Sequence, residues 1–469
     1  MNELAQEKIS VKKPWVKPTL VIHRSGFMNK FGSAGSHNHI EDLDGIPIAS
    51  LISKYGSPQF VISEKQLRRN YQRLHDAFAD RYPHVQMAWS YKTNYLGAVC
   101  NTFHQQGAWA EVVSGFEYEK ARSLGIEGRH ILFNGPHKTR SDLERAIEEG
   151  AHLHIDHLDE LYLIDAIATE RQTRTDVTIR LNFDTGYTEP WSRFGFNVES
   201  GQAMDAAWRI ASSDYLCLTG LHSHIGTYVL EHRAYTKQAH IMCDFMNKVE
   251  QETRCSINTI DIGGGFASKN ALQGIYLPPE QVVPSYEQYA EAVCDVILEA
   301  THHRQRQSRQ RPVLILETGR ALVDDAEILL TSVVANKRLP DGRRAVILDA
   351  GVNALFTAFW YNHQITPTKK LEGVVEETVL YGPLCMNIDV VRASIMLPPL
   401  EVGDVLQISP VGAYNNTQWL QFIEYRPPVV YIAHNGIDTL VRRKEMLSDI
   451  TALETLPEHL VLNTQDSNA

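Results

Sequence analysis

Short apolar runs alternate with helix-like segments from about residue 87 to about residue 320. Each run ends in a polar or glycine-containing stretch, and the segments between carry apolar residues three and four positions apart. The pattern predicts eight strands, at residues 87–92, 109–114, 130–135, 151–156, 177–182, 218–225, 259–265 and 312–319. Parallel strands need crossover helices, and eight such units close into a ring. We therefore predict a (β/α)8 barrel rather than an open sheet.

After residue 320 the pattern changes, because apolar runs are joined by Gly, Pro and Asp turns and helical periodicity is weak. This change predicts a mostly β domain over residues 321–469. The barrel is expected to occupy residues 61–320, and residues 1–60 are expected to lead into the β domain. The predicted fold class is α/β, a (β/α)8 barrel followed by a mostly β domain.

Composition narrows the functional classes. The 469 residues carry a net charge of −11, which argues against binding nucleic acid or an anionic membrane surface. No run approaches the roughly 18 apolar residues of a membrane helix, and the N-terminus lacks the apolar core of a secretory signal. The six cysteines form no CxxC pair, which favours reduced thiols in a cytoplasmic protein. The basic stretch 301–312 is expected to be a solvated loop.

Residues with reactive side chains gather at the ends of the predicted strands, where barrels of this kind hold their active sites. Alternation in the first strand places Ala88, Ser90 and Lys92 on the inner face. Burial there would lower the pKa of Lys92 and favour Schiff-base chemistry. The alternative is a structural lysine paired with a barrel carboxylate.

The glycines Gly263, Gly264 and Gly265 follow the seventh strand. Such a turn exposes backbone N–H groups to an anion such as phosphate, although it can also be a tight turn without a ligand. The residue Cys385 lies in a Gly-Pro turn that can present a thiol, although a lone cysteine is usually a small buried hydrophobe.

Two HxH pairs, His152 with His154 and His222 with His224, open a different class of function. Such pairs can bind zinc, so a metal-dependent hydrolase on a barrel is an alternative. That enzyme would use Glu317 as an acidic ligand, and it would leave Lys92 and the glycines without a role. The whole set fits pyridoxal 5′-phosphate better, because this cofactor needs an amine, phosphate donors and an acid at the pyridine nitrogen. No metal is then required.

In matching order over about residues 40–440, the motifs SYKTN, EVVSGFE, HSHIG, IGGGF, ETGR, GPLC and GAY resemble those of the fold-type III pyridoxal-phosphate decarboxylases. The diaminopimelate decarboxylase group is the most similar, and ornithine decarboxylase is more distant. The resemblance implies an alanine racemase-like barrel, pyridoxal phosphate and a homodimer with shared active sites. It implies that Lys92 binds the cofactor as a Schiff base, with Glu111 nearby, and that His224 stacks on the pyridine ring. It also implies that Glu317 contacts the pyridine nitrogen and that Arg320 contacts the phosphate or the substrate carboxylate. The residues that it implies at the phosphate are Thr227, Gly263, Gly264, Gly265 and Tyr414.

The resemblance also implies a reaction. The substrate amine displaces Lys92, CO2 leaves, and Cys385 of the partner subunit or Lys92 returns a proton to Cα. An amino-acid racemase is the alternative within this cofactor class. Racemases of this type place an arginine at the pyridine nitrogen, so Glu317 favours decarboxylation.

Two positions depart from the diaminopimelate enzymes, which carry a glutamate where this chain has Met386 and an arginine where it has Thr357. In that family these two residues read the distal ammonium and the distal carboxylate of the substrate. The departure predicts a different substrate, an amino-acid-derived biosynthetic intermediate of the siderophore or antibiotic type. The alternative is that other residues replace the contacts and diaminopimelate decarboxylation in lysine biosynthesis persists. The candidates for this replacement are Arg193, Asn387, Asp389 and Tyr361.

Overall fold

The computed structural model describes residues 38–306 and 309–462. The expectation about a secretory signal lies outside these residues, as does most of the segment 1–60. Among the described helices, none combines the length and apolar composition that a membrane span requires.

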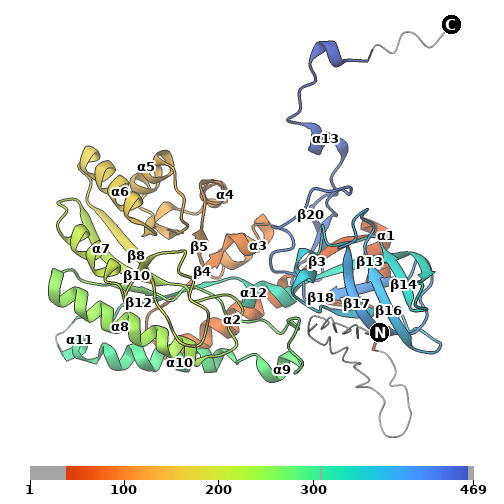
Figure 1. Cartoon of the computed structure of the whole chain (residues 1–469), viewed down its shortest axis with the longest axis horizontal. Helices are drawn as coiled ribbons and strands as arrows, with labels where there is room; N and C mark the ends of the chain where they lie inside the picture. Colours follow the sequence, from red (N-terminus) through yellow and green to blue (C-terminus); the bar gives the residue numbers. More distant parts are fainter. Residues whose placement is uncertain (1–37, 307–308, 463–469) are drawn as a thin grey trace, which may run out of the picture. The chain divides into compact units, whose positions relative to one another are not determined.

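Eight parallel strands form a closed barrel, which confirms the predicted fold (Figure 1). Each strand pairs with the next, β10 pairs with β8, and β12 returns to β4. Every one of them overlaps a predicted run. The strands are β4 (Val85–Ser90), β5 (Trp109–Val112), β6 (Ile131–Phe133), β7 (His152–Ile155), β8 (Thr175–Asn182), β10 (Leu216–Ser223), β11 (Thr259–Asp261) and β12 (Val313–Thr318). A short strand β9 (Phe196–Asn197) pairs with β8.

Helices follow the barrel strands, and polar caps start several of them. Ser63 and Ser114 each accept a backbone N–H at a helix start, and Thr139 and Ser285 form capping boxes. The longer helices are α2 (Glu64–Ala79), α3 (Gly97–His104), α4 (Gly115–Ser123), α5 (Arg140–Glu148), α6 (Leu158–Arg171), α7 (Gln202–Ala211), α8 (Arg233–Thr253) and α10 (Tyr286–Ala300). The short ones are α9 (Pro279–Val282), α11 (His302–Arg306), α12 (Arg320–Val323) and α13 (Leu447–Thr451).

The β domain is built around one long strand, β13 (Glu327–Arg338). Its first half pairs with β3 and β18, and its second half pairs with β14. The other strands are β1 (Asp42–Leu43), β2 (Ile46–Pro47), β3 (Gln59–Ser63), β14 (Arg344–Leu348), β15 (Gln364–Pro367), β16 (Glu376–Tyr381), β17 (Val390–Leu397), β18 (Val405–Ser409), β19 (Val429–Ile432) and β20 (Asp438–Arg442).

The chain enters the β domain before it enters the barrel. Helix α1 (Ile48–Tyr55) contributes Ile48 and Leu51 to a small apolar cluster with β-domain residues. Strand β3 then lies between β13 and β19 and ends at Ser63, the cap of the first barrel helix. This strand crosses the boundary that we placed after residue 60, and the exact domain limits stay predictions.

The prediction of a solvated loop at residues 301–312 is wrong for its first part. Residues 302–306 form helix α11, and Arg304 is buried. Its guanidinium lies 2.5 Å from Glu250 Oε1 and also donates to the Ile257 carbonyl. A buried ion pair therefore anchors a stretch that looks like exposed basic sequence.

Candidate active site

The first barrel strand ends two residues earlier than its sequence pattern suggests. Strand β4 stops at Ser90, and Lys92 lies in the short 3₁₀ turn Tyr91–Thr93. The predicted alternation is confirmed, because Trp89 packs in the main core while Ala88 lies in a small separate cluster with residues of the neighbouring strands. The turn brings the Lys92 amine to the C-terminal end of the barrel.

The amine of Lys92 donates to Glu111 Oε2 at 2.6 Å. Burial alone would lower the pKa of Lys92, but the negative charges of Glu111 and Glu317 outweigh burial and raise it above its ordinary value. The prediction of a lowered pKa is therefore wrong. The sequence pattern predicted the desolvation, but it did not place two carboxylates beside the amine.

A hydrogen-bonded chain joins these two carboxylates. Glu111 is buried and accepts from Ser90 Oγ at 2.5 Å as well as from Lys92. Asn134, at the end of the third barrel strand, donates through Nδ2 to Glu111 Oε1 at 3.3 Å and also to Glu317 Oε1. Four strand ends thus hold one lysine and two carboxylates in fixed relation.

A buried cluster lies beside Glu317. Ligand atoms of Glu317, His154, His222 and Asp261 lie within 4.8 Å of one another, and His222 Nε2 is 3.2 Å from Glu317 Oε2. Burial holds the pKa of both histidines well below the usual range, so they are neutral. Burial and the charge of Glu317 raise the pKa of Asp261 well above its ordinary value.

The two histidines of each HxH pair do not lie together, although one histidine of each pair joins Asp261 and Glu317 in a group whose side chains could hold a metal ion. His224 accepts a hydrogen bond from the Gly264 N–H at 3.1 Å, and His152 stacks on Trp109 at 4.9 Å between ring centroids. One member of each pair, His154 and His222, lies beside Glu317 instead. The predicted zinc pairs are therefore separated.

The glycine turn packs closely around His224. A Cβ on Gly264 would lie 2.3 Å from the Glu317 carbonyl oxygen, and Gly263 and Gly265 adopt positive φ of 68° and 93°. The Gly263 N–H donates to Asp261, so within the described residues only Gly265 of the three has an N–H without a partner. Burial and neighbouring positive charges lower the pKa of His224 to about 3, so its ring is neutral.

The residues Arg320 and Tyr414 form a second group. The Arg320 guanidinium lies 4.7 Å from the centroid of Tyr361 and 5.1 Å from that of Tyr414. It also lies 3.4 Å from Asp324 Oδ2, while its Nε is buried without a partner in the described chain. By contrast, the Thr227 side chain is exposed.

Cys385 lies on the loop between β16 and β17. The thiol is exposed, and Met386 follows it on the same loop. Asp389 is buried and holds the loop in shape, accepting from the Val352 and Leu384 N–H groups at 2.8 and 2.7 Å.

The side chain of Thr357 is also buried. Its hydroxyl lies 2.9 Å from His363 Nε2 and 3.0 Å from Asn415 Oδ1. Because His363 Nδ1 lies 2.7 Å from the Pro410 carbonyl, it carries the proton, so His363 Nε2 and Asn415 Oδ1 are both acceptors for the single hydroxyl proton of Thr357. The hydroxyl is satisfied inside the protein.

Sequence reasoning missed three buried acids near the site: Asp261, Asp324 and Glu327. A signal for Asp261 existed, since it precedes the glycines on an inward strand face. Asp324 stands four residues after Arg320, a spacing that allows a pair on a helix. Nothing in the sequence marks Glu327, because its partners Asn94 and Asn416 come from distant loops.

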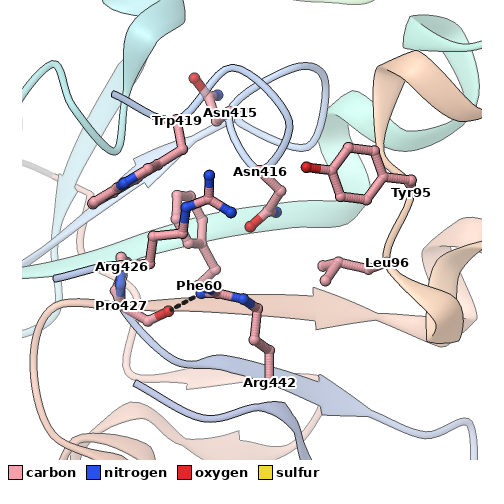
Figure 2. A pocket seen from close by; sticks show the side chains of 9 residues that line it. All are labelled: Phe60, Tyr95, Leu96, Asn415, Asn416, Trp419, Arg426, Pro427 and Arg442. Atoms are coloured by element: carbon pink, nitrogen blue, oxygen red, sulfur yellow. Dashed lines mark hydrogen bonds between the residues drawn. The ribbon is translucent and has the colours of Figure 1, made fainter. Parts of the chain in front are cut away.

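A small pocket lies beside the turn that carries Lys92 (Figure 2). The residues that line it are Phe60, Tyr95, Leu96, Asn415, Asn416, Trp419, Arg426, Pro427 and Arg442. Its lining includes Tyr95 and Leu96, which follow the Lys92 turn, and Asn415 and Asn416, which follow Tyr414.

These residues fit the pyridoxal phosphate that the sequence predicts. The site holds an amine, a buried carboxylate, a neutral imidazole and a glycine turn that no other residue type fits. Within the part of the chain that the structure describes, the Gly265 N–H and the Arg320 Nε have no partner, so both are available to an anion such as phosphate.

Comparison with known proteins agrees. Residues 65–324 match the family model described as pyridoxal-dependent decarboxylase, pyridoxal binding domain. The diaminopimelate decarboxylase of Methanocaldococcus jannaschii is 30% identical over 437 residues, which cover 89% of this chain and 96% of that protein. The Bacillus subtilis enzyme of the same name is 25% identical and covers 91% and 98%. A crystal structure of the M. jannaschii enzyme superposes with a TM-score of 0.80 at 28% identity, over 91% of this chain and 99% of that one.

Proposed function

The chain belongs to the pyridoxal-dependent decarboxylase family, and we propose that its substrate is a modified amino acid rather than diaminopimelate. Its cofactor is pyridoxal phosphate, and its reaction is the decarboxylation of an amino acid. The observation that carries the finer proposal is the buried hydroxyl of Thr357, whose one proton is donated inside the protein, to Asn415 Oδ1 or His363 Nε2. The proposed substrate is a biosynthetic intermediate of the siderophore or antibiotic type.

When bound, pyridoxal phosphate supplies an electron sink for the electron pair that the departing carboxylate leaves on Cα. Lys92 would hold the cofactor through Nζ, and Glu317 would hold a proton at the ring nitrogen. His224, neutral and fixed by the Gly264 N–H, would orient the ring. The groups proposed to hold the phosphate are Gly263, Gly264, Gly265, Thr227, Arg320 and Tyr414.

Two residues are proposed to handle the remaining chemistry. Glu111 holds the Lys92 amine by the 2.6 Å hydrogen bond and would orient it when the substrate amine takes its place. Once CO2 has left, a proton must replace it on Cα. We assign that proton to Cys385 of a second subunit or to Lys92, because the thiol of the same chain is exposed and makes no contact with the site in the described residues.

The two positions that depart from the diaminopimelate enzymes, Thr357 and Met386, support a substrate without the charged end of diaminopimelate. Thr357 replaces an arginine and turns its hydroxyl inward, and Met386 replaces a glutamate. The four candidate replacements all have other contacts or lie exposed. Asp389 holds its own loop, and Asn387 is exposed. The ring of Tyr361 faces Arg320.

Arg193 is the fourth candidate. It is exposed and lies over Phe194, 5.1 Å from the ring centroid. The names of the curated relatives favour diaminopimelate itself as the alternative substrate. The proposed substrate and diaminopimelate differ only in the distal group of the amino acid.

Kinetics on meso-diaminopimelate and on a panel of amino acids with neutral or enlarged distal ends decide between them. Removing one buried charged partner costs about 2–5 kcal/mol, so losing both should lower kcat/KM on the order of 10³-fold or more. We expect CO2 release from a panel member and poor turnover of meso-diaminopimelate. A kcat/KM above about 10⁴ M⁻¹s⁻¹ for meso-diaminopimelate would contradict the proposal. Racemisation without CO2 release would contradict decarboxylation.

The attachment of the cofactor has its own test. The purified protein should show a visible absorbance band that disappears on borohydride reduction, with the added mass on the peptide that contains Lys92. A Lys92→Ala variant should show neither. Stoichiometric zinc without such absorbance would favour the hydrolase.

We also propose a homodimer with shared active sites. Mixing a Lys92→Ala chain with a Cys385→Ala chain should restore about a quarter of the activity after random exchange, because each heterodimer would hold one intact site. No recovery despite demonstrated exchange would place both residues in one chain's site.

The six cysteines are unpaired, which supports the proposed cytoplasmic location.

A further inference from the structure

A fully buried carboxylate joins the two loops that carry Lys92 and Tyr414. Glu327 is the first residue of β13 and is 0% exposed. Its Oε2 accepts from Asn94 Nδ2 at 3.0 Å, and its Oε1 accepts from Asn416 Nδ2 at 2.5 Å. Within the described residues, no lysine, arginine or histidine pairs with it.

The two asparagines occupy matching places. Asn94 lies two residues after Lys92, and its Oδ1 accepts the Leu96 N–H at 3.2 Å, which fixes the turn. Asn416 lies two residues after Tyr414. Glu327 therefore touches both loops immediately beyond their functional side chains.

Backbone groups support the same junction. The Tyr414 N–H donates to the Thr93 carbonyl at 2.8 Å, and Thr417 Oγ1 donates to the Lys92 carbonyl at 2.9 Å. Asn94 Nδ2 also lies 3.2 Å from the Gly412 carbonyl. These contacts set the two loops side by side, but none of them fixes the Asn416 side chain.

The Asn416 side chain also borders the small pocket described above. Figure 2 shows Asn416 at the wall of the pocket, facing the space between Tyr95 and Arg426. Without an acceptor in the protein, Asn416 has room to turn into this pocket. The hydrogen bond to Glu327 is thus what keeps it against the Lys92 turn.

Burying the Glu327 carboxylate lowers the stability of the fold, because two amide donors offset only part of the free energy that its desolvation costs. Burial raises the pKa of Glu327 well above its ordinary value. An apolar residue at this position would avoid that cost, but it would leave both asparagine amides without an acceptor.

We propose that Glu327 is a positioning residue that holds the Lys92 and Tyr414 loops at a fixed separation. The consequence for the cofactor rests on the proposed function, in which Lys92 grips the ring end and Tyr414 the phosphate end. The junction between the loops does not depend on it. Glu327 therefore acts through Asn94 and Asn416 and does not touch the reacting atoms.

Three variants test the proposal. Glu327→Ala removes both acceptors, and Glu327→Gln keeps the shape and one acceptor oxygen. Glu250→Gln is the matched control, because Glu250 is a nearly buried carboxylate in helix α8 that pairs with Arg304 instead. Each is measured as apoenzyme by hydrogen–deuterium exchange, and then by titration with pyridoxal phosphate.

In Glu327→Ala we expect exchange to rise about tenfold in both peptides, 91–96 and 411–419. The apparent Kd for pyridoxal phosphate should rise at least about tenfold, with a weaker visible band after loading. Glu327→Gln should stay within about threefold of the wild type. Glu250→Gln should lose thermal stability without changing either loop or the cofactor affinity.

Unchanged exchange in both loops of Glu327→Ala would overturn the proposal, as would equal losses in the Glu250→Gln control. If Glu327→Ala does not fold, Asn416→Ala takes its place, and faster exchange confined to peptide 411–419 with weaker cofactor binding is then expected. Its failure to change either would also overturn the proposal. If the wild type itself does not bind the cofactor through Lys92, the proposed function fails, while the exchange experiment still tests the junction.

Discussion

Replacing Glu117 by glutamine should remove a large part of the pH dependence of stability. Glu117 lies in the first turn of α4, is 5% exposed, and accepts the Val113 N–H at 2.9 Å. Burial and the charge of Glu111 raise its pKa from 4.5 to about 7, although the Val113 N–H and Lys92 act in the opposite direction.

The sign follows from where the proton is held. Below pH 4.5 Glu117 is protonated in both the folded and the unfolded chain, so its contribution to stability is complete. As the pH rises towards about 7, the unfolded chain ionises freely while the folded chain must keep the proton, and stability is lost. A pKa difference of about 2.5, at about 1.4 kcal/mol for each unit, corresponds to about 3 kcal/mol.

Urea unfolding of the apoenzyme, followed by tryptophan fluorescence at several values between pH 4.5 and pH 8, measures the effect. Glu117→Gln should match the wild type at the acidic end and exceed its stability by about 3 kcal/mol at pH 8. Glu119→Gln, an exposed glutamate on the same helix, is the control and should run parallel to the wild type. If Glu117→Gln also ran parallel to the wild type, the burial argument for this carboxylate would be refuted.

Three further changes have expected outcomes. Gly264→Ala would set a Cβ 2.3 Å from the Glu317 carbonyl, so unfolding should show a loss of about 1–3 kcal/mol and cofactor titration a weaker affinity. Lys138→Met breaks a fully buried pair with Glu160 and should cost about 3–5 kcal/mol in urea unfolding, of which adding Glu160→Gln should restore a part. Gln172→Gly relieves a positive φ of 51° at the end of α6 and should raise the melting temperature slightly, by up to about 1 kcal/mol in stability.

The barrel could be predicted because its signal is local and repeated. Eight apolar runs with crossover helices leave few other topologies, and inward alternation placed Ser90 correctly beside the site. The pKa of Lys92 could not be predicted in this way. Its direction is set by Glu111 and Glu317, which come from other strands and whose distance to the amine no sequence spacing gives. The pattern of one strand was enough to predict that Lys92 is buried. The charges around Lys92 could be known only once the closed barrel had brought the other strands beside it.

The buried ion pair of Arg304 also depends on residues from distant parts of the chain. The stretch around Arg304 reads as basic and polar, and only the fold brings Glu250 from helix α8 to meet it. The position of the pair His222 and His224 was not predictable for a related reason. Period-2 spacing places both histidines of a pair on one face of an extended strand, but β10 ends at Ser223, so His224 turns towards the glycines while His222 stays beside Glu317.

The interpretation of Thr357, one of the two positions proposed to set substrate specificity, needs both the sequence and the structure. From the sequence, Thr357 is only a missing arginine, and a threonine hydroxyl can still bind a substrate carboxylate. The structure adds that this hydroxyl has a partner in His363, whose other ring nitrogen is committed to the Pro410 carbonyl. Burial lowers the pKa of His363 to about 4, so the ring stays neutral at physiological pH and cannot supply the positive charge that the arginine would have provided. A distal carboxylate at this position would therefore meet no cation from Thr357 or His363, and recognition of the distal group must come from other residues.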